Sequence, residues 1–155
     1  MSSRLPLFGA ALPSLLLGAG LAGCVGGALA STVSRTSPAA PPDAFTCIQE
    51  QLKKAGFRRS SYDTDALRVT GQKFNESARR SDVQFRRLVD RVEFEVSPDS
   101  GGVTRLTAEA ATFAERMTHR GPTEEQEKTS EIARAAADTV LERCSTPVDS
   151  TQVPG

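Results

Sequence analysis

The most restrictive pattern in this chain is a strict alternation of apolar and charged residues near its middle. Val92, Phe94 and Val96 alternate with charged residues, and a period of two places all three side chains on one face of a β-strand. A turn-forming cluster at residues 97–102 follows, and apolar residues then recur with the same period from Leu106. The pattern predicts an antiparallel hairpin with one buried face.

Two more strands and two helices are expected around this hairpin. A helix is predicted to begin at Asp43 as its N-cap, because apolar residues follow at helical spacing. Residues 57–62 and 67–74 predict two short strands on either side of a turn. A second helix is predicted to open at Thr123, where Gln126 completes a capping box.

The predicted order is therefore helix, about four antiparallel strands, helix. A run of strands without intervening helices favours an antiparallel sheet, and both helices are then available to cover its apolar face. We expect an α+β fold, a two-layer sandwich with both helices on one face of the sheet. Residues 43–144 are expected to form this single domain.

The N-terminal segment is composed differently from the rest of the chain. Residues 5–23 carry no charge and follow a single cation, Arg4. The apolar run at residues 12–21 is shorter than the ~20 residues that a membrane-spanning helix needs. This arrangement is typical of a secretory signal peptide, which is removed from the mature protein.

The signal segment ends in the tetrapeptide Leu21-Ala22-Gly23-Cys24. This tetrapeptide resembles the lipobox of bacterial lipoproteins, and the resemblance covers residues 1–24. It implies cleavage before Cys24, attachment of a diacylglyceryl group to the Cys24 thiol, and anchoring in the cell envelope facing the periplasm. In enteric-type bacteria, Val25 at the next position favours the outer membrane over the inner one.

A competing cleavage site lies close by, since Ala28-Leu29-Ala30 also fits the small-residue pattern of an ordinary secretory signal. If the lipobox is used, residues 24–42 are expected to be a flexible tether, because Gly, Ser and Pro dominate them. Residues 145–155 are expected to be a loose tail.

The two remaining cysteines, Cys47 and Cys144, lie in the predicted first and second helices. An oxidising compartment favours pairing of an even number of cysteines. We predict a disulfide between them, which requires the two helices to lie side by side. The alternative is a pair of buried free thiols.

Candidate catalytic and metal-binding residues are few. Asp99-Ser100-Gly101-Gly102 resembles the segment around the nucleophile of trypsin-like proteases over four residues, but no histidine precedes it to act as a base. His119, the one histidine, lies in a polar segment, and Asp63 and Asp65 are explained by a turn. We expect no enzyme activity, no cofactor and no metal.

Charge is distributed unevenly along the chain. Residues 53–91 contain 11 basic and 5 acidic residues, whereas residues 92–155 contain 6 basic and 12 acidic ones. Either the basic half contacts an anionic lipid, a cell-wall polymer or a protein partner, or it pairs with the acidic final helix. Arg79 and Arg80, placed in a loop, are the candidate contacts. The chain lacks an aromatic platform for nucleic acid, which is not expected as a partner.

These observations favour a non-enzymatic cell-envelope lipoprotein, a structural or interaction module tethered through Cys24. The alternative is an envelope module that encloses a small apolar ligand between its sheet and helices.

Overall fold

The computed structural model describes residues 29–75, 78 and 80–145. The predicted signal segment, Cys24, Arg79 and nearly all of the predicted tail lie outside these residues. In chain order, the described elements are β1 (Ser31–Ser37), α1 (Pro41–Lys54), β2 (Arg58–Asp63), β3 (Arg68–Asn75), β4 (Phe85–Pro98), a short 3-10 turn (Ser100–Gly102), β5 (Thr104–Thr118), β6 (Gly121–Glu127) and α2 (Glu131–Ser145).

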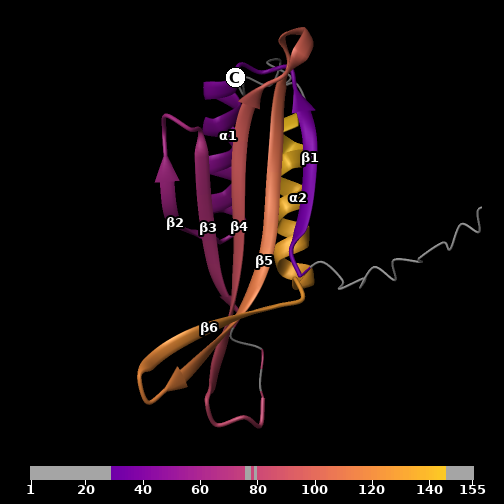
Figure 1. Ribbon diagram of the computed structural model, residues 1–155. Helices are drawn as coiled ribbons and strands as arrows, with labels where there is room; N and C mark the ends of the chain where they lie inside the picture. Colours follow the sequence, from indigo (N-terminus) through magenta and orange to yellow (C-terminus); the bar gives the residue numbers. More distant parts are fainter. Residues whose placement is uncertain (1–28, 76–77, 79, 146–155) are drawn as a thin grey trace, which may run out of the picture.

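The strands form one antiparallel sheet of six strands in the order β1-β5-β4-β3-β2, with β6 also paired to β5. Strand β1 pairs with residues 104–110 of β5, and β6 pairs with residues 112–118. The two strands thus share one edge of β5, one after the other. Past Ser31, the first residue of β1, the long strands β4 and β5 continue with β6 as a twisted ribbon (Figure 1).

The two helices lie side by side along the upper part of the sheet (Figure 1). Apolar side chains from both helices meet those of β3, β4 and β5 in one core. The predicted hairpin is confirmed, since Val96 of β4 pairs with Leu106 of β5 and both are buried. The largest fully buried apolar side chains are Phe94, Ile48, Leu106 and Leu141.

The predicted fold, a two-layer sandwich of about four strands with both helices on one face, is wrong. The sheet has six strands among the described residues, and the prediction missed β1 and β6. The ribbon formed by β6 with the ends of β4 and β5 extends past both helices (Figure 1). The molecule is therefore mostly an antiparallel sheet, and the helices pack against one part of it.

Strand β1 lies inside the segment predicted to be a tether. Its sequence is polar, with Val33 as its one large apolar residue, and most of its side chains are exposed. Its backbone pairs with β5 over seven residues. These backbone hydrogen bonds stabilise β1 although it buries few apolar side chains, because an edge strand pairs with one neighbour only.

Strand β6 lies where the second helix was predicted to begin, and the capping box at Thr123 and Gln126 does not form. The chain instead turns at Gly121, whose φ of 111° suits glycine, and pairs back along β5. Helix α2 begins at Glu131, and the hydroxyl of Ser130 caps it by accepting a hydrogen bond from the Ala133 amide.

Helix α1 also begins earlier than predicted. Ala40 is its N-cap residue and Pro41 and Pro42 form its first turn, so Asp43 lies inside the helix and is not its cap. Proline suits the first helical position because its fixed φ is helical and the missing N–H has no partner there. At the other end, Gly56 adopts a φ of 78°, the left-handed conformation in which glycine commonly ends a helix.

Candidate functional site

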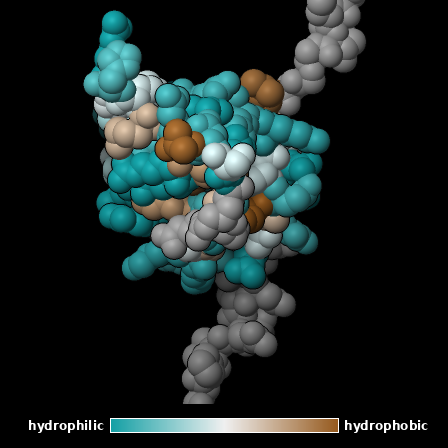
Figure 2. Space-filling view, turned by 90° about the horizontal axis from the view of Figure 1, so that it is seen from below, coloured by the Kyte–Doolittle hydropathy of each residue, from teal (hydrophilic) through white to brown (hydrophobic). Residues whose placement is uncertain are grey.

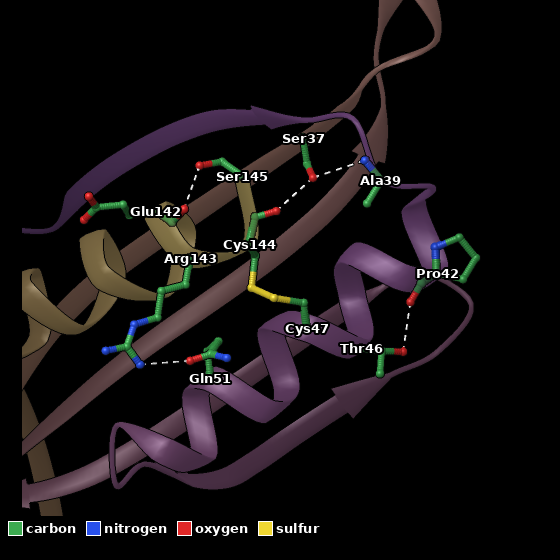
Figure 3. The surroundings of a disulfide bond; sticks show 10 residues. All are labelled: Ser37, Ala39, Pro42, Thr46, Cys47, Gln51, Glu142, Arg143, Cys144 and Ser145. Carbon is green, nitrogen blue, oxygen red and sulfur yellow. Dashed lines mark hydrogen bonds between the residues drawn. A yellow bond between two sulfur atoms is a disulfide. The ribbon is translucent and has the colours of Figure 1, made fainter. Parts of the chain in front are cut away.

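A disulfide joins the two helices. Cys47 and Cys144 have Cα atoms 5.8 Å apart, within the ~7 Å limit for bridging, and the predicted pair is confirmed. Figure 3 shows that Ser37, the last residue of β1, lies beside Cys144 of this disulfide. The Ser37 hydroxyl of β1 donates a 2.8 Å hydrogen bond to the Cys144 carbonyl and accepts a 3.3 Å one from the Ala39 amide.

Of the two predicted anionic-partner contacts, Arg79 lies outside the described residues and Arg80 is already paired within the chain. Both terminal nitrogens of Arg80 donate to the Glu127 carboxylate of β6 at 2.5 Å. The guanidinium of Arg80 also stacks on the Phe85 ring, at 4.8 Å. The side-chain hydrogen bond lowers the pKa of Glu127 and raises that of Arg80.

A second group of charges lies farther along the ribbon. Arg86 and Arg87 both donate to Glu115 of β5, at 2.8 and 2.7 Å. They reach the same carboxylate because a register shift between Phe85 and Arg87 interrupts the alternation. Burial raises the pKa of Glu115, but hydrogen bonds and positive charge from both arginines outweigh burial and hold it below 4.5.

Two arginine side chains of the ribbon also stack on aromatic rings. Phe74, Val89 and Phe113 lie opposite one another on three neighbouring strands. Arg87 covers the Phe74 ring at 3.7 Å, and Arg91 covers Phe113 at 4.7 Å. The two arginines thus cover part of each apolar ring.

Most arginines of the described chain have such acidic partners. Seen from below, the surface is mainly hydrophilic, with hydrophobic residues scattered singly (Figure 2). Ion pairs join Arg35 to Asp138, Arg68 to Glu93 and Glu95, Arg80 to Glu127, Arg86 and Arg87 to Glu115, Arg91 to Glu124, Arg105 to Asp99, Arg116 to Asp82 and Glu125, and Arg134 to Glu131.

The carboxylates that neutralise the basic ribbon therefore come mainly from β5, β6 and the segment before β4. From the final helix α2, Asp138 pairs with Arg35 of β1 at 3.9 Å, and Glu131 pairs with Arg134 inside the helix. The expected pairing of basic strands with the acidic helix is thus replaced by pairing between strands.

One group of cations differs from these paired arginines and lines a groove between α1 and the strands β2 and β3. It has a volume of about 510 Å³. We call it the basic groove and define it by its lining residues: Gln49, Glu50, Leu52, Lys53, Phe57, Arg58, Arg59 and Val69.

The rim of the basic groove carries Lys53, Arg58 and Arg59, all exposed. Among the described residues, none of the three forms an ion pair with a carboxylate. Glu50 lines the same groove, so three positive charges face one negative charge, an excess of two. Lys73 adds a further cation beside the groove, with its Nζ 5.7 Å from the centre of the Phe57 ring.

The floor of the basic groove is apolar because α1 approaches the sheet closely at Gly71. Leu52 of α1 packs over that glycine, where an added Cβ would lie 2.8 Å from a Leu52 methyl carbon. Leu52, Phe57 and Val69 are each at most 4% exposed. The groove therefore has a closely packed apolar floor beneath its positively charged rim.

Strand β2 leaves the groove open. All of its side chains are exposed, and a register shift between Arg59 and Ser61 interrupts its pairing with β3. Arg59 stacks on Tyr62, with its guanidinium carbon 4.6 Å from the ring centre, and Tyr62 stacks on Phe45 of α1. Arg58 lines the groove as well, although strict alternation predicts opposite faces for neighbouring residues.

The other sequence candidates occupy turns. The Asp63 carboxylate accepts hydrogen bonds from the Asp65 and Ala66 amides, and Asp99 accepts one from Ser100. His119 is exposed in the turn between β5 and β6. Within the described ranges, no three His, Cys, Asp or Glu side chains are grouped as a metal site requires.

Sequence reasoning missed the basic groove, although a signal for it exists. Four cations (Lys53, Lys54, Arg58 and Arg59) fall between residues 51 and 62 with no acidic residue among them. Of the predicted contacts, Arg79 lies outside the described residues and Arg80 pairs with Glu127.

No known family model matches the chain, and no curated protein matches it in sequence. Neither helix of the described part is long and apolar enough to cross a membrane.

Proposed function

We propose that this protein is a non-enzymatic lipoprotein of the bacterial cell envelope, an interaction module held to the membrane through Cys24. The lipobox-like tetrapeptide supports the anchor, with Val25 favouring the outer membrane. In this proposal the folded part faces the periplasm and binds an anionic partner in the basic groove.

One observation carries the binding part of the proposal. Most arginines of the described chain pair with internal carboxylates, whereas Lys53, Arg58 and Arg59 share a groove and form no ion pair with any other described residue. Arginine binds carboxylate and phosphate in a bidentate manner, and several such cations in one groove attract an anion more strongly than scattered ones.

The anchor is tested by Cys24→Ser. The wild-type chain is expected to partition with membranes and to gain the mass of the attached lipid, and Cys24→Ser is expected to lose both properties. An unmodified wild-type chain that begins at Ser31 would rule out the anchor.

The binding site is tested separately, with immobilised anionic phospholipid and anionic cell-wall polymer. We expect retention that falls as salt rises, because exposed charges are screened beyond ~8 Å at physiological ionic strength. Arg58→Gln/Arg59→Gln is expected to weaken retention, whereas the matched variant Arg120→Gln/Lys128→Gln, which removes two exposed cations elsewhere, is expected to leave it unchanged. Equal loss in both variants would show that the groove has no special role.

A further inference from the structure

We infer that the basic groove holds an anionic phospholipid of the anchoring membrane, with its headgroup on the rim and part of an acyl chain on the floor. This inference rests on the proposed function and names its partner. It draws on the chemistry of the groove and on the short length of chain between Cys24 and the sheet.

The groove has a charged part and an apolar part, as an amphiphilic ligand does. Lys53, Arg58 and Arg59 line it together with Phe57 and Val69. An uncharged apolar ligand would leave the cations without partners, whereas a ligand with a negative group and a hydrocarbon part pairs with the cations and also contacts the carbon atoms beneath them. A lipid with one negative headgroup satisfies both parts.

The volume also suits such a ligand. About 510 Å³ lies within the ~300–1,000 Å³ typical of small-molecule sites. Because β2 leaves the groove open and all of that strand's side chains are exposed, a chain can enter from the side while the headgroup remains near solvent.

The hydrogen bonds that hold the residues before β1 limit the distance between the sheet and the anchoring membrane. Leu29 is fixed to the start of α2, because its carbonyl accepts hydrogen bonds from the Thr129 amide at 3.1 Å and the Thr129 hydroxyl at 2.6 Å. Four residues lie between Cys24 and Leu29, and the five residue steps from one to the other span at most ~18 Å when fully extended. The lipidated residue therefore stays within that distance of the sheet.

The basic groove lies level with this attachment point. Ser31, the first residue of β1, belongs to one cross-strand row that ends at Arg59 and passes through Ala110, Val92 and Gly71. Four strand spacings correspond to ~19 Å. The distance from Ser31 to the groove is thus similar to the maximum distance between Cys24 and Leu29. We therefore infer that the groove lies within reach of lipids of the anchoring membrane.

The inference is tested with the mature chain, residues 24–155, carrying Cys24→Ser so that no attached lipid drives membrane binding. Co-sedimentation is measured with vesicles of phosphatidylcholine, with and without phosphatidylglycerol. We expect binding only when phosphatidylglycerol is present. Lys53→Gln/Arg58→Gln/Arg59→Gln is expected to weaken it about a hundredfold, since each cation near an anionic surface contributes about a factor of five.

Contact with the acyl chain is measured separately. The chain contains no tryptophan, so Gln49→Trp places a single fluorophore in the groove, and Thr123→Trp places a matched one on β6. Phosphatidylglycerol with brominated acyl chains is expected to quench the fluorophore at residue 49 and not the one at residue 123.

The outcomes separate the inference from the function on which it rests. Equal binding to uncharged vesicles, or vesicle binding without quenching at residue 49, would overturn the lipid assignment. Binding of soluble cell-wall polymer in place of vesicles would overturn the lipid assignment and leave the anionic-partner function standing. Binding to neither would overturn both.

Discussion

The buried carboxylate of Asp90 on β4 accepts a 2.7 Å hydrogen bond from the hydroxyl of Ser130, the residue that caps α2. The same oxygen accepts a second 2.7 Å hydrogen bond from Thr112 of β5, whose hydroxyl in turn accepts from the Ser130 amide. Asp90 is 0% exposed. One acidic side chain thus fixes the first residues of α2 against β4 and β5. This contact lies where the ribbon of β4, β5 and β6 begins.

We therefore expect Asp90→Ala to lower the free energy of unfolding by about 2–4 kcal/mol, because the hydroxyls of buried Thr112 and half-buried Ser130 lose an acceptor. Asp90→Asn keeps an oxygen acceptor and is expected to be less destabilised. The measurement is urea denaturation followed by circular dichroism. A midpoint of Asp90→Ala equal to that of the wild type would contradict the role given to this carboxylate.

The disulfide is expected to contribute strongly to stability. Cys47 and Cys144 are separated by 97 residues, for which the loss of chain entropy in the unfolded state predicts about 4–5 kcal/mol before any strain. Reductant is expected to lower the melting temperature of the wild-type protein. Cys47→Ala/Cys144→Ala is expected to melt at that lower temperature with or without reductant, and an equal response to reductant in both proteins would exclude this account.

The ion pairs of the ribbon predict an acid sensitivity. The pKa values of Glu115 and Glu127 lie below their ordinary value of 4.5 in the folded state. Groups with a depressed folded pKa contribute stability above the unfolded pKa and lose it as the pH falls through the folded pKa. The contribution of these pairs is therefore full above pH 4.5 and is lost progressively below it.

Glu115→Gln/Glu127→Gln is expected to be less stable than the wild type at neutral pH and to show a shallower loss of stability below pH 4.5. The measurement is the urea midpoint as a function of pH. Glu109→Gln removes an exposed carboxylate outside these ion pairs and serves as the control. Parallel pH profiles for the wild type and the double variant would contradict the assignment.

The close approach of α1 to the sheet predicts a steric coupling between Gly71 and Leu52. An added Cβ at Gly71 would lie 2.8 Å from a Leu52 methyl carbon, so Gly71→Ala is expected to destabilise the fold by about 1–3 kcal/mol. In a Leu52→Ala background the same substitution is expected to cost less, which a double-mutant cycle measures. Strictly additive effects would show that the two side chains do not conflict.

The sequence predicted the elements whose residues show their own period. Val92, Phe94 and Val96 identify β4 because their burial alternates, and Cys47 and Cys144 pair because two helices bring them together. Strands β1 and β6 carry no such period. Both lie along an edge of β5 with most side chains exposed, so the pairing partner decides their conformation, and it is distant in sequence.

The same reasoning explains why the groove was missed. Its shape depends on the register shift in β2 and on the close approach of Leu52 to Gly71, and neither feature leaves a periodic pattern in the sequence. The doublets Arg58-Arg59 and Arg79-Arg80 look alike in the sequence. The difference is that Arg80 has Glu127 as a partner across the ribbon, and Glu127 lies 47 residues later in the chain.

The central claim, that the basic groove is the binding site, is tested most directly by nuclear magnetic resonance of the lipid-free mature chain during titration with a short-chain anionic phospholipid. The account predicts that the largest amide shift changes fall on residues that line the groove, Lys53, Phe57, Arg58 and Arg59 among them, and that β6 is little affected. Shift changes centred on the ribbon, or no changes at saturating lipid, would contradict it.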